Sequence, residues 1–177
     1  MKRKGLAGMK ALAAVVAAVT ALWIGYGCNT SGCTENQSAL PLAGFCSSET
    51  GAAISVSNME VRGLGAPDDS VLYAAESTGR SEVYLPFRST QNNTTYLFTY
   101  HADSVTTVTD RIAFTYDAEP RFVSEECGAM FFYRITKVDY TTNLIDSVVV
   151  TDSLINNLNI KRILIYFRTG QNPDEND

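Results

Sequence analysis

The stretch YLFTY at residues 96–100 places an aromatic residue at every second position, and IAFTY at residues 112–116 places a large apolar residue in the same way. Alternation with a period of two is typical of a β-strand that buries one face. Residues 101–104, between the two stretches, favour a turn. We therefore predict two strands whose aromatic side chains fill a hydrophobic core.

Short runs of the same character recur on both sides of these strands, separated by turn residues roughly every ten positions. No stretch after residue 50 has a convincing helical period. The pattern predicts an all-β fold, a two-sheet antiparallel β-sandwich of about eight strands. Pro86 indicates a sheet edge, because proline has no backbone N–H to donate. The expected strands cover residues 54–61 (with a bulge or bend before Met59), 71–75, 83–87, 96–100, 112–116, 130–138, 145–150 and 160–167.

The first residues have the pattern of an export signal. Four basic residues lie in the first ten positions, and residues 11–24 form an almost purely apolar run. That run is too short to span a membrane, which takes roughly 17–25 apolar residues. We therefore expect a signal peptide at residues 1–27. Cys28 follows at the cleavage position and resembles the cysteine of a bacterial lipobox, with Gly25 where leucine is usual.

A lipidated cysteine would anchor the mature chain to a membrane, since each buried methylene group contributes about 0.8 kcal/mol. Cys33 is a rival acceptor, but it lies farther from the apolar run, so we expect lipid attachment at Cys28. After it we expect a tether at residues 28–50, a β-sandwich domain at 51–170 and a disordered acidic tail at 171–177.

Charge limits the partners and the location. Without residues 1–27 the chain has ten basic and nineteen acidic residues, a net charge of −9. Such an acidic body excludes a nucleic-acid partner, which needs clustered lysine and arginine. Some Bacteroidota lipoproteins carry an acidic surface-export signal just after the cysteine, whereas here the first acid is Glu35. We therefore expect a lipid-anchored protein of the outer membrane that faces the periplasm.

The remaining cysteines meet oxidising conditions if the chain is exported. With Cys28 acylated, Cys33, Cys46 and Cys127 allow three single pairings, each of which leaves one thiol over. Counting does not choose among them.

Several segments, each a strand with a turn, resemble a known family. They are Cys28 with Cys33, LPF at 85–87, TDRI at 109–112, FVSEECGAMFF at 122–132, TNLIDS at 142–147 and the end at 159–167. Together they resemble an uncharacterised lipoprotein family of the Bacteroidota, known as domain of unknown function 6452.

This resemblance implies an envelope location, a β-sandwich, and a disulfide between Cys33 and Cys127 that leaves Cys46 as a free thiol. It implies no reaction. Family members are often encoded beside a predicted outer-membrane β-barrel protein, which makes such a protein a candidate partner.

Motifs for catalysis are missing from the sequence. There is no Gly-x-Ser-x-Gly elbow, no phosphate-binding glycine loop and no Cys-x-x-Cys, and His101 is the only histidine. The pairs Asp68-Asp69 and Glu125-Glu126 are sequence neighbours, which strand geometry would point apart. We therefore expect no catalytic residues, no metal and no cofactor, and a protein that is not an enzyme.

Two patterns concern binding and modification. Aromatic stripes at 96/98/100 and at 131/133/135 favour a core, with a sugar-binding platform as the alternative. Asp-Ser-aliphatic triplets resemble the acceptors of Bacteroidota O-glycosylation, although Asp-Ser also commonly begins a strand. We expect a lipid-anchored envelope protein with a non-enzymatic binding or assembly role, or alternatively a glycan-binding accessory module. The candidate glycosylation sites are Ser70, Ser104, Ser147 and Ser153.

Overall fold

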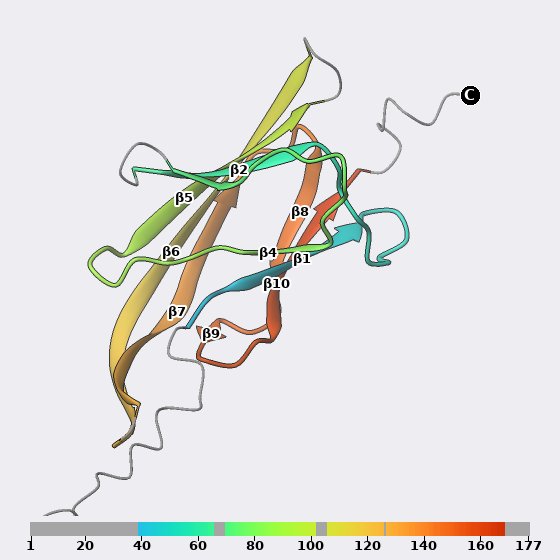
Figure 1. Ribbon diagram of the computed structural model, residues 1–177. Coiled ribbons are helices and arrows are strands. Elements are labelled where there is room, and N and C mark those ends of the chain that lie inside the picture. The colour runs from blue at the N-terminus through green and yellow to red at the C-terminus, as the bar shows by residue number, and fades with distance from the viewer. Residues whose placement is uncertain (1–38, 66–69, 102–105, 126, 169–177) are drawn as a thin grey trace, which may run out of the picture. The chain divides into compact units, whose positions relative to one another are not determined.

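The structure is a computed structural model that describes residues 39–65, 70–101, 106–125 and 127–168. This part of the chain is all-β and contains ten strands in two sheets (Figure 1). The predicted two-sheet sandwich is confirmed, with ten strands instead of about eight. The strands are β1 (Leu42–Ser47), β2 (Met59–Leu64), β3 (Val71–Tyr73), β4 (Glu82–Tyr84), β5 (Asn93–His101), β6 (Thr107–Ser124), β7 (Gly128–Tyr140), β8 (Ile145–Val150), β9 (Leu154–Ile155) and β10 (Lys161–Phe167).

The six-stranded sheet has the order β3-β2-β5-β6-β7-β9. Its centre is the antiparallel pair β5–β6, which stays in register from Asn93↔Thr115 to His101↔Thr107. The two alternating stretches that predicted strands lie here, and their apolar faces are buried. The prediction that these aromatic residues form core is confirmed.

The four-stranded sheet has the order β4-β1-β10-β8. Its two central strands, β1 and β10, run parallel, which corrects the expectation of a wholly antiparallel fold. Strand β1 also corrects the domain boundary, because it lies inside the expected tether of residues 28–50 and all six of its residues are buried. Residues 28–38 lie outside the described part. A strand buried on both faces has no polar alternation, so the sequence pattern did not reveal it.

The two sheets share one hydrophobic core. Phe167 of β10 meets Tyr100 of β5 edge to face, with ring centroids 5.9 Å apart, and meets Phe45 of β1 in the same way at 5.2 Å. The small sheet contributes Ala43, Phe45, Val83, Ile145, Ile163, Ile165 and Phe167, and the large sheet contributes Met59, Val61, Tyr96, Phe98, Tyr100, Ile112, Phe114, Tyr116, Tyr133, Ile135 and Ile155.

The expected strand at residues 54–61 forms only in its second half. Asn58 adopts a left-handed backbone conformation (φ 52°), which asparagine tolerates, and this produces the predicted bend before Met59. Upstream of the bend the chain makes only isolated bridges, one of them between Val56 and Arg80.

Strand β4 is an edge strand, as Pro86 predicted. It ends at Tyr84, so the expected strand at residues 83–87 is shorter than predicted. Leu85 and Phe87 are nevertheless buried in the core.

Strands β6 and β7 are the longest in the described chain and outrun their neighbours. Pairing of β5 with β6 stops at Thr115, and β9 pairs with β7 only at Tyr133 and Arg134. Residues 117–124 of β6 and 128–132 of β7 therefore form a two-stranded ribbon, which we name the β6–β7 arm (Figure 1).

Candidate functional site

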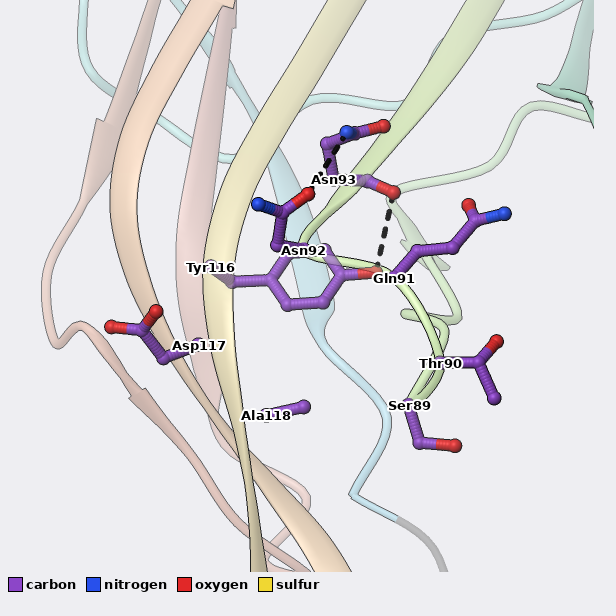
Figure 2. Close-up of a pocket in the computed structure, with 8 residues that line it drawn as sticks. All are labelled: Ser89, Thr90, Gln91, Asn92, Asn93, Tyr116, Asp117 and Ala118. Atoms are coloured by element: carbon purple, nitrogen blue, oxygen red, sulfur yellow. Dashed lines mark hydrogen bonds between the residues drawn. The ribbon is translucent and has the colours of Figure 1, made fainter.

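An open hollow of about 580 Å³ lies where the β6–β7 arm leaves the sandwich. One wall is formed by residues 89–93, which are the loop before β5 and the first residue of that strand, and the other is the start of the arm. Figure 2 shows Tyr116 and Ala118 pointing toward the loop, whereas Asp117 points away from it, as alternation along a strand requires. The lining residues are Ser89, Thr90, Gln91, Asn92, Asn93, Tyr116, Asp117 and Ala118.

The hydroxyl group of Tyr116 holds the loop through hydrogen bonds at both of its ends. It accepts a hydrogen bond from the backbone N–H of Arg88 at 2.8 Å and lies 2.7 Å from the Thr94 hydroxyl, where either group can donate. The backbone N–H of Tyr116 donates to the carbonyl of Asn92 at 2.9 Å. Because Tyr116 is fully buried, these bonds are shielded from water.

The side chain of Arg88, the residue just before the same loop, ties the start of the loop to the end of β2. Its guanidinium group donates to the carbonyls of Gly65 at 2.7 Å and Leu64 at 3.1 Å, both at the end of β2. A further bond of 3.2 Å reaches the amide oxygen of Gln91. The loop is therefore held at a fixed place by one buried tyrosine and one arginine.

An aromatic cluster supports the loop underneath. The Phe87 ring stacks on the Tyr116 ring, with centroids 4.2 Å apart and an angle of 3°, and the Tyr133 ring meets Phe87 edge to face at 5.6 Å. The Tyr96 hydroxyl donates to the carbonyl of Pro86. Burial raises the pKa of Tyr96 and of Tyr133 above the ordinary value, so both phenols stay neutral under ordinary conditions.

The side chains of the loop contribute little to holding it. The five residues 89–93 are all exposed. Ser89 and Thr90 make no hydrogen bond to any residue that the structure describes, and Asn93 donates to its neighbour Asn92 at 3.2 Å. The hollow is thus bordered by hydroxyl and amide groups that remain available for a ligand.

The hollow is lined mainly by hydroxyl and amide side chains. Apart from the buried Tyr116, its one titratable lining residue is Asp117, whose side chain points away. Hydrolysis of a glycosidic bond generally takes two carboxyl groups that face each other. Within the described chain no three His, Cys, Asp or Glu side chains cluster closely enough to hold a metal ion.

The comparisons with known proteins place the chain in a family. The model of the family of unknown function DUF6452 matches residues 58–167. The chain belongs to this family. No curated protein and no solved structure matches it.

The DUF6452 match begins after β1, although β1 lies in the middle of the small sheet between β4 and β10. The folded unit is therefore longer than the matched segment. The described residues include no helix that is long and apolar enough to cross a membrane.

Two segments on which the DUF6452 resemblance rested, TDRI and TNLIDS, meet at Asp110. This carboxylate is completely buried and accepts hydrogen bonds from the Thr141 hydroxyl at 2.7 Å and from the backbone N–H groups of Asn143, Leu144 and Ile145 at 2.7–2.9 Å. It fixes the turn between β7 and β8. The role of these segments is structural, since four donors satisfy the carboxylate.

The cysteine predictions fall on both sides of the described boundary. Cys28 and Cys33 lie outside the described residues, so lipid attachment and the Cys33–Cys127 disulfide stay predictions. Cys46 is a buried free thiol in β1, as the resemblance implied. Cys127 lies just before β7, at the tip of the β6–β7 arm, and its N–H donates to the Ser124 hydroxyl at 3.1 Å.

The candidate glycosylation sites are scattered. Ser70 precedes β3, Ser147 lies in β8, and Ser153 precedes β9; all three are half-buried, and Ser104 lies outside the described residues. The structure brings none of the three together, and none of them lines the hollow.

Sequence reasoning missed the loop at residues 89–93, which lies between the strands expected at 83–87 and 96–100. The available signal was the run STQNN itself. Its five consecutive side chains carry hydroxyl or amide groups, which can both donate and accept hydrogen bonds. The sequence near the loop does not show that Tyr116 supports it together with Arg88, because Tyr116 lies on another strand, far from the loop in the chain.

Proposed function

We propose that this member of the DUF6452 family is a non-enzymatic binding module of the cell envelope, anchored by a lipid on Cys28 and facing the periplasm from the outer membrane. The observation that carries the binding role is the loop at residues 89–93. Arg88 and the buried Tyr116 hold this loop in place while its polar side chains face an open hollow. Binding residues are often found on loops that a rigid scaffold positions.

The anchor is supported by the sequence around Cys28. A basic start, a short apolar run and small residues before the cysteine are the features of an exported lipoprotein. If the proposal holds, mass spectrometry of the mature amino terminus finds a diacylglyceryl group on Cys28, and Cys28→Ser releases the protein from membranes or leaves it unprocessed. A mature chain that begins at an unmodified Cys28 would contradict the anchor.

The Cys33–Cys127 disulfide belongs to the same proposal. Because Cys46 is buried and free, Cys127 has no pairing with it. The family resemblance implies the pairing of Cys33 with Cys127, and a free Cys46 agrees with it. O-glycosylation at Ser70, Ser104, Ser147 or Ser153 is likewise proposed on the triplet pattern alone.

The binding role is tested by cross-linking in intact envelopes. A diazirine-bearing residue is placed at position 90 in the loop, and a matched one at the exposed Glu49, in the turn after β1. A diazirine inserts into neighbouring C–H, N–H and O–H bonds, so it captures a protein and a glycan alike. We expect adducts from position 90 and not from position 49. The absence of adducts from position 90, or equal labelling at the two positions, would remove the binding role.

A glycan is the second candidate ligand, and the exposed end of one aromatic stripe favours it. In the stripe at 131/133/135, Tyr133 and Ile135 are core residues, whereas Phe131 is 41% exposed. The expectation that this stripe is core therefore fails at Phe131. An outer-membrane β-barrel protein is the other candidate, and it rests on the family resemblance.

A further inference from the structure

The loop at residues 89–93 is neutral. None of its five side chains ionises, and the nearest cation, Arg88, is already occupied by the carbonyls of Leu64 and Gly65. Asp117 points away from the hollow (Figure 2). A phosphate or carboxylate ligand would find no free positive charge here, so the loop suits an uncharged ligand with many hydroxyl groups.

The face of the arm that continues from the hollow is apolar. Alternation along β6 places Pro120 and Phe122 on the same face as Tyr116 and Ala118. Phe131 of β7 lies directly opposite Pro120 and therefore shares this face. Phe122 is 71% exposed, so two aromatic side chains of this face remain open to solvent.

The two surfaces follow one another along β6. Ala118 borders the hollow, and Phe122 follows four residues later on the same strand, roughly 13 Å away at the rise of an extended chain. A ligand that reaches from the loop to Phe122 is several units long. The protein therefore presents a polar loop followed by an apolar strand face along the same direction.

We propose that the loop at residues 89–93 and the apolar face of the β6–β7 arm form a binding site for a neutral glycan chain; this deepens, and rests on, the binding role proposed above. The hydroxyl groups of one sugar unit bind the amide and hydroxyl side chains of the loop. The faces of sugar rings carry apolar C–H groups, which pack on the aromatic rings of Phe131 and Phe122. A neutral carbohydrate uses both the uncharged loop and the exposed aromatic rings.

Affinity electrophoresis of the full-length protein, kept in a mild detergent, tests the assignment. Native gels contain laminarin, dextran, mannan or hydroxyethyl cellulose as neutral probes, and alginate as an acidic one. We expect retardation in at least one neutral gel and none in alginate. Phe122→Ala with Phe131→Ala is expected to weaken the retardation roughly tenfold, as for two lost aromatic contacts. Asn92→Ala is expected to weaken it as well.

The control is Val149→Ala, because Val149 is 43% exposed on β8 of the other sheet and should leave retardation unchanged. Circular dichroism and a melting curve show whether each variant is folded. Migration unaffected by every neutral polysaccharide, or equal loss in the control, would overturn the glycan assignment. If position 90 then cross-links to a protein, the binding role survives with a different ligand, whereas no adduct and no retardation would remove both proposals.

Discussion

The ring of Tyr116 lies parallel to the ring of Phe87, 4.2 Å away between centroids, and this stack brings the Tyr116 hydroxyl under the backbone of Arg88. One residue thus joins the core to the loop that borders the hollow. The ring supplies apolar contact, and the oxygen supplies hydrogen bonds to the segment where the loop begins.

Tyr116→Phe separates these two contributions. The stack stays, but the Arg88 N–H and the Thr94 hydroxyl lose a partner in a buried place. We expect a loss of about 1–3 kcal/mol in the free energy of unfolding, because a buried polar group without a partner costs about that much. Urea unfolding measures it. Tyr140→Phe is the control, since the Tyr140 hydroxyl has no partner among the described residues; similar losses in both variants would contradict the role of the Tyr116 hydroxyl.

Asp110→Asn is expected to destabilise the domain more strongly. In the variant an NH₂ group replaces one carboxylate oxygen, and this group cannot accept a hydrogen bond from a backbone N–H. One oxygen of Asp110 accepts from Thr141 and Asn143, and the other accepts from Leu144 and Ile145, so at least one buried hydrogen bond is lost either way. We expect a loss of roughly 3 kcal/mol, as for hydrogen bonds to a buried charged group. Hydrogen exchange should show faster opening at the amides of residues 143–145 than in the core strands.

If those amides remain as protected in Asp110→Asn as in the wild type, Asp110 does not fix the turn. Asp117→Asn is the matched control, because the Asp117 side chain is exposed and has no partner among the residues described. It should leave both stability and exchange unchanged.

Tyr100→Phe should behave in the opposite way to Tyr116→Phe. The Tyr100 hydroxyl is buried and has no hydrogen-bond partner among the described residues, so its removal should leave stability at neutral pH unchanged or slightly higher. Burial, together with the nearby Asp110 carboxylate, raises the pKa of Tyr100 well above its ordinary value.

This raised pKa predicts alkaline unfolding with a definite sign. Above about pH 10 the unfolded chain releases the phenolic proton while the folded chain keeps it. The free energy of unfolding therefore falls as the pH rises above about 10. Tyr96 and Tyr133 act in the same direction. Tyr100→Phe should lower the slope of unfolding free energy against pH above that value, and an unchanged slope would contradict the assignment.

The proposed disulfide predicts a matched pair of losses. A Cys33–Cys127 bond closes a loop of about 95 residues, which in the chain-entropy model stabilises the fold by roughly 4–5 kcal/mol. Cys33→Ser and Cys127→Ser should lower the melting temperature equally, and the double variant should lower it little further. Cys46→Ala is the control, because Cys46 is buried and serine would add the cost of a buried hydroxyl. Unequal single losses would contradict the pairing.

The sequence predicted best where local alternation coincides with burial. Tyr96, Phe98 and Tyr100 alternate because one face of β5 meets the core and the other meets water. Strand β1 has no such contrast, since both of its faces are buried, and its parallel partner β10 is supplied by the far end of the chain. Such long-range pairing leaves no local signal.

The candidate site was less predictable still. The polar run at residues 89–93 is an ordinary turn by composition, and only the tertiary structure shows that Arg88 and Tyr116 support it. Phe131 followed the periodic pattern of a core residue, yet the arm carries it beyond the sheet that would cover it. Alternation identifies a face of a strand, but not where the opposite layer ends.

The parallel pairing of β1 with β10 has a consequence for the order of folding. During synthesis the hairpins of the large sheet can close as soon as neighbouring segments emerge, whereas β1 waits for residues at the other extreme of the chain. Contacts between such distant segments form slowly, because the entropy of closing a long loop is lost before the new contacts stabilise the chain. Until then β1 has only β4, which is three residues long, as a neighbour. A chain stopped before residue 161 would leave Phe45 without its aromatic partner in β10 and would be a target for chaperones and proteases.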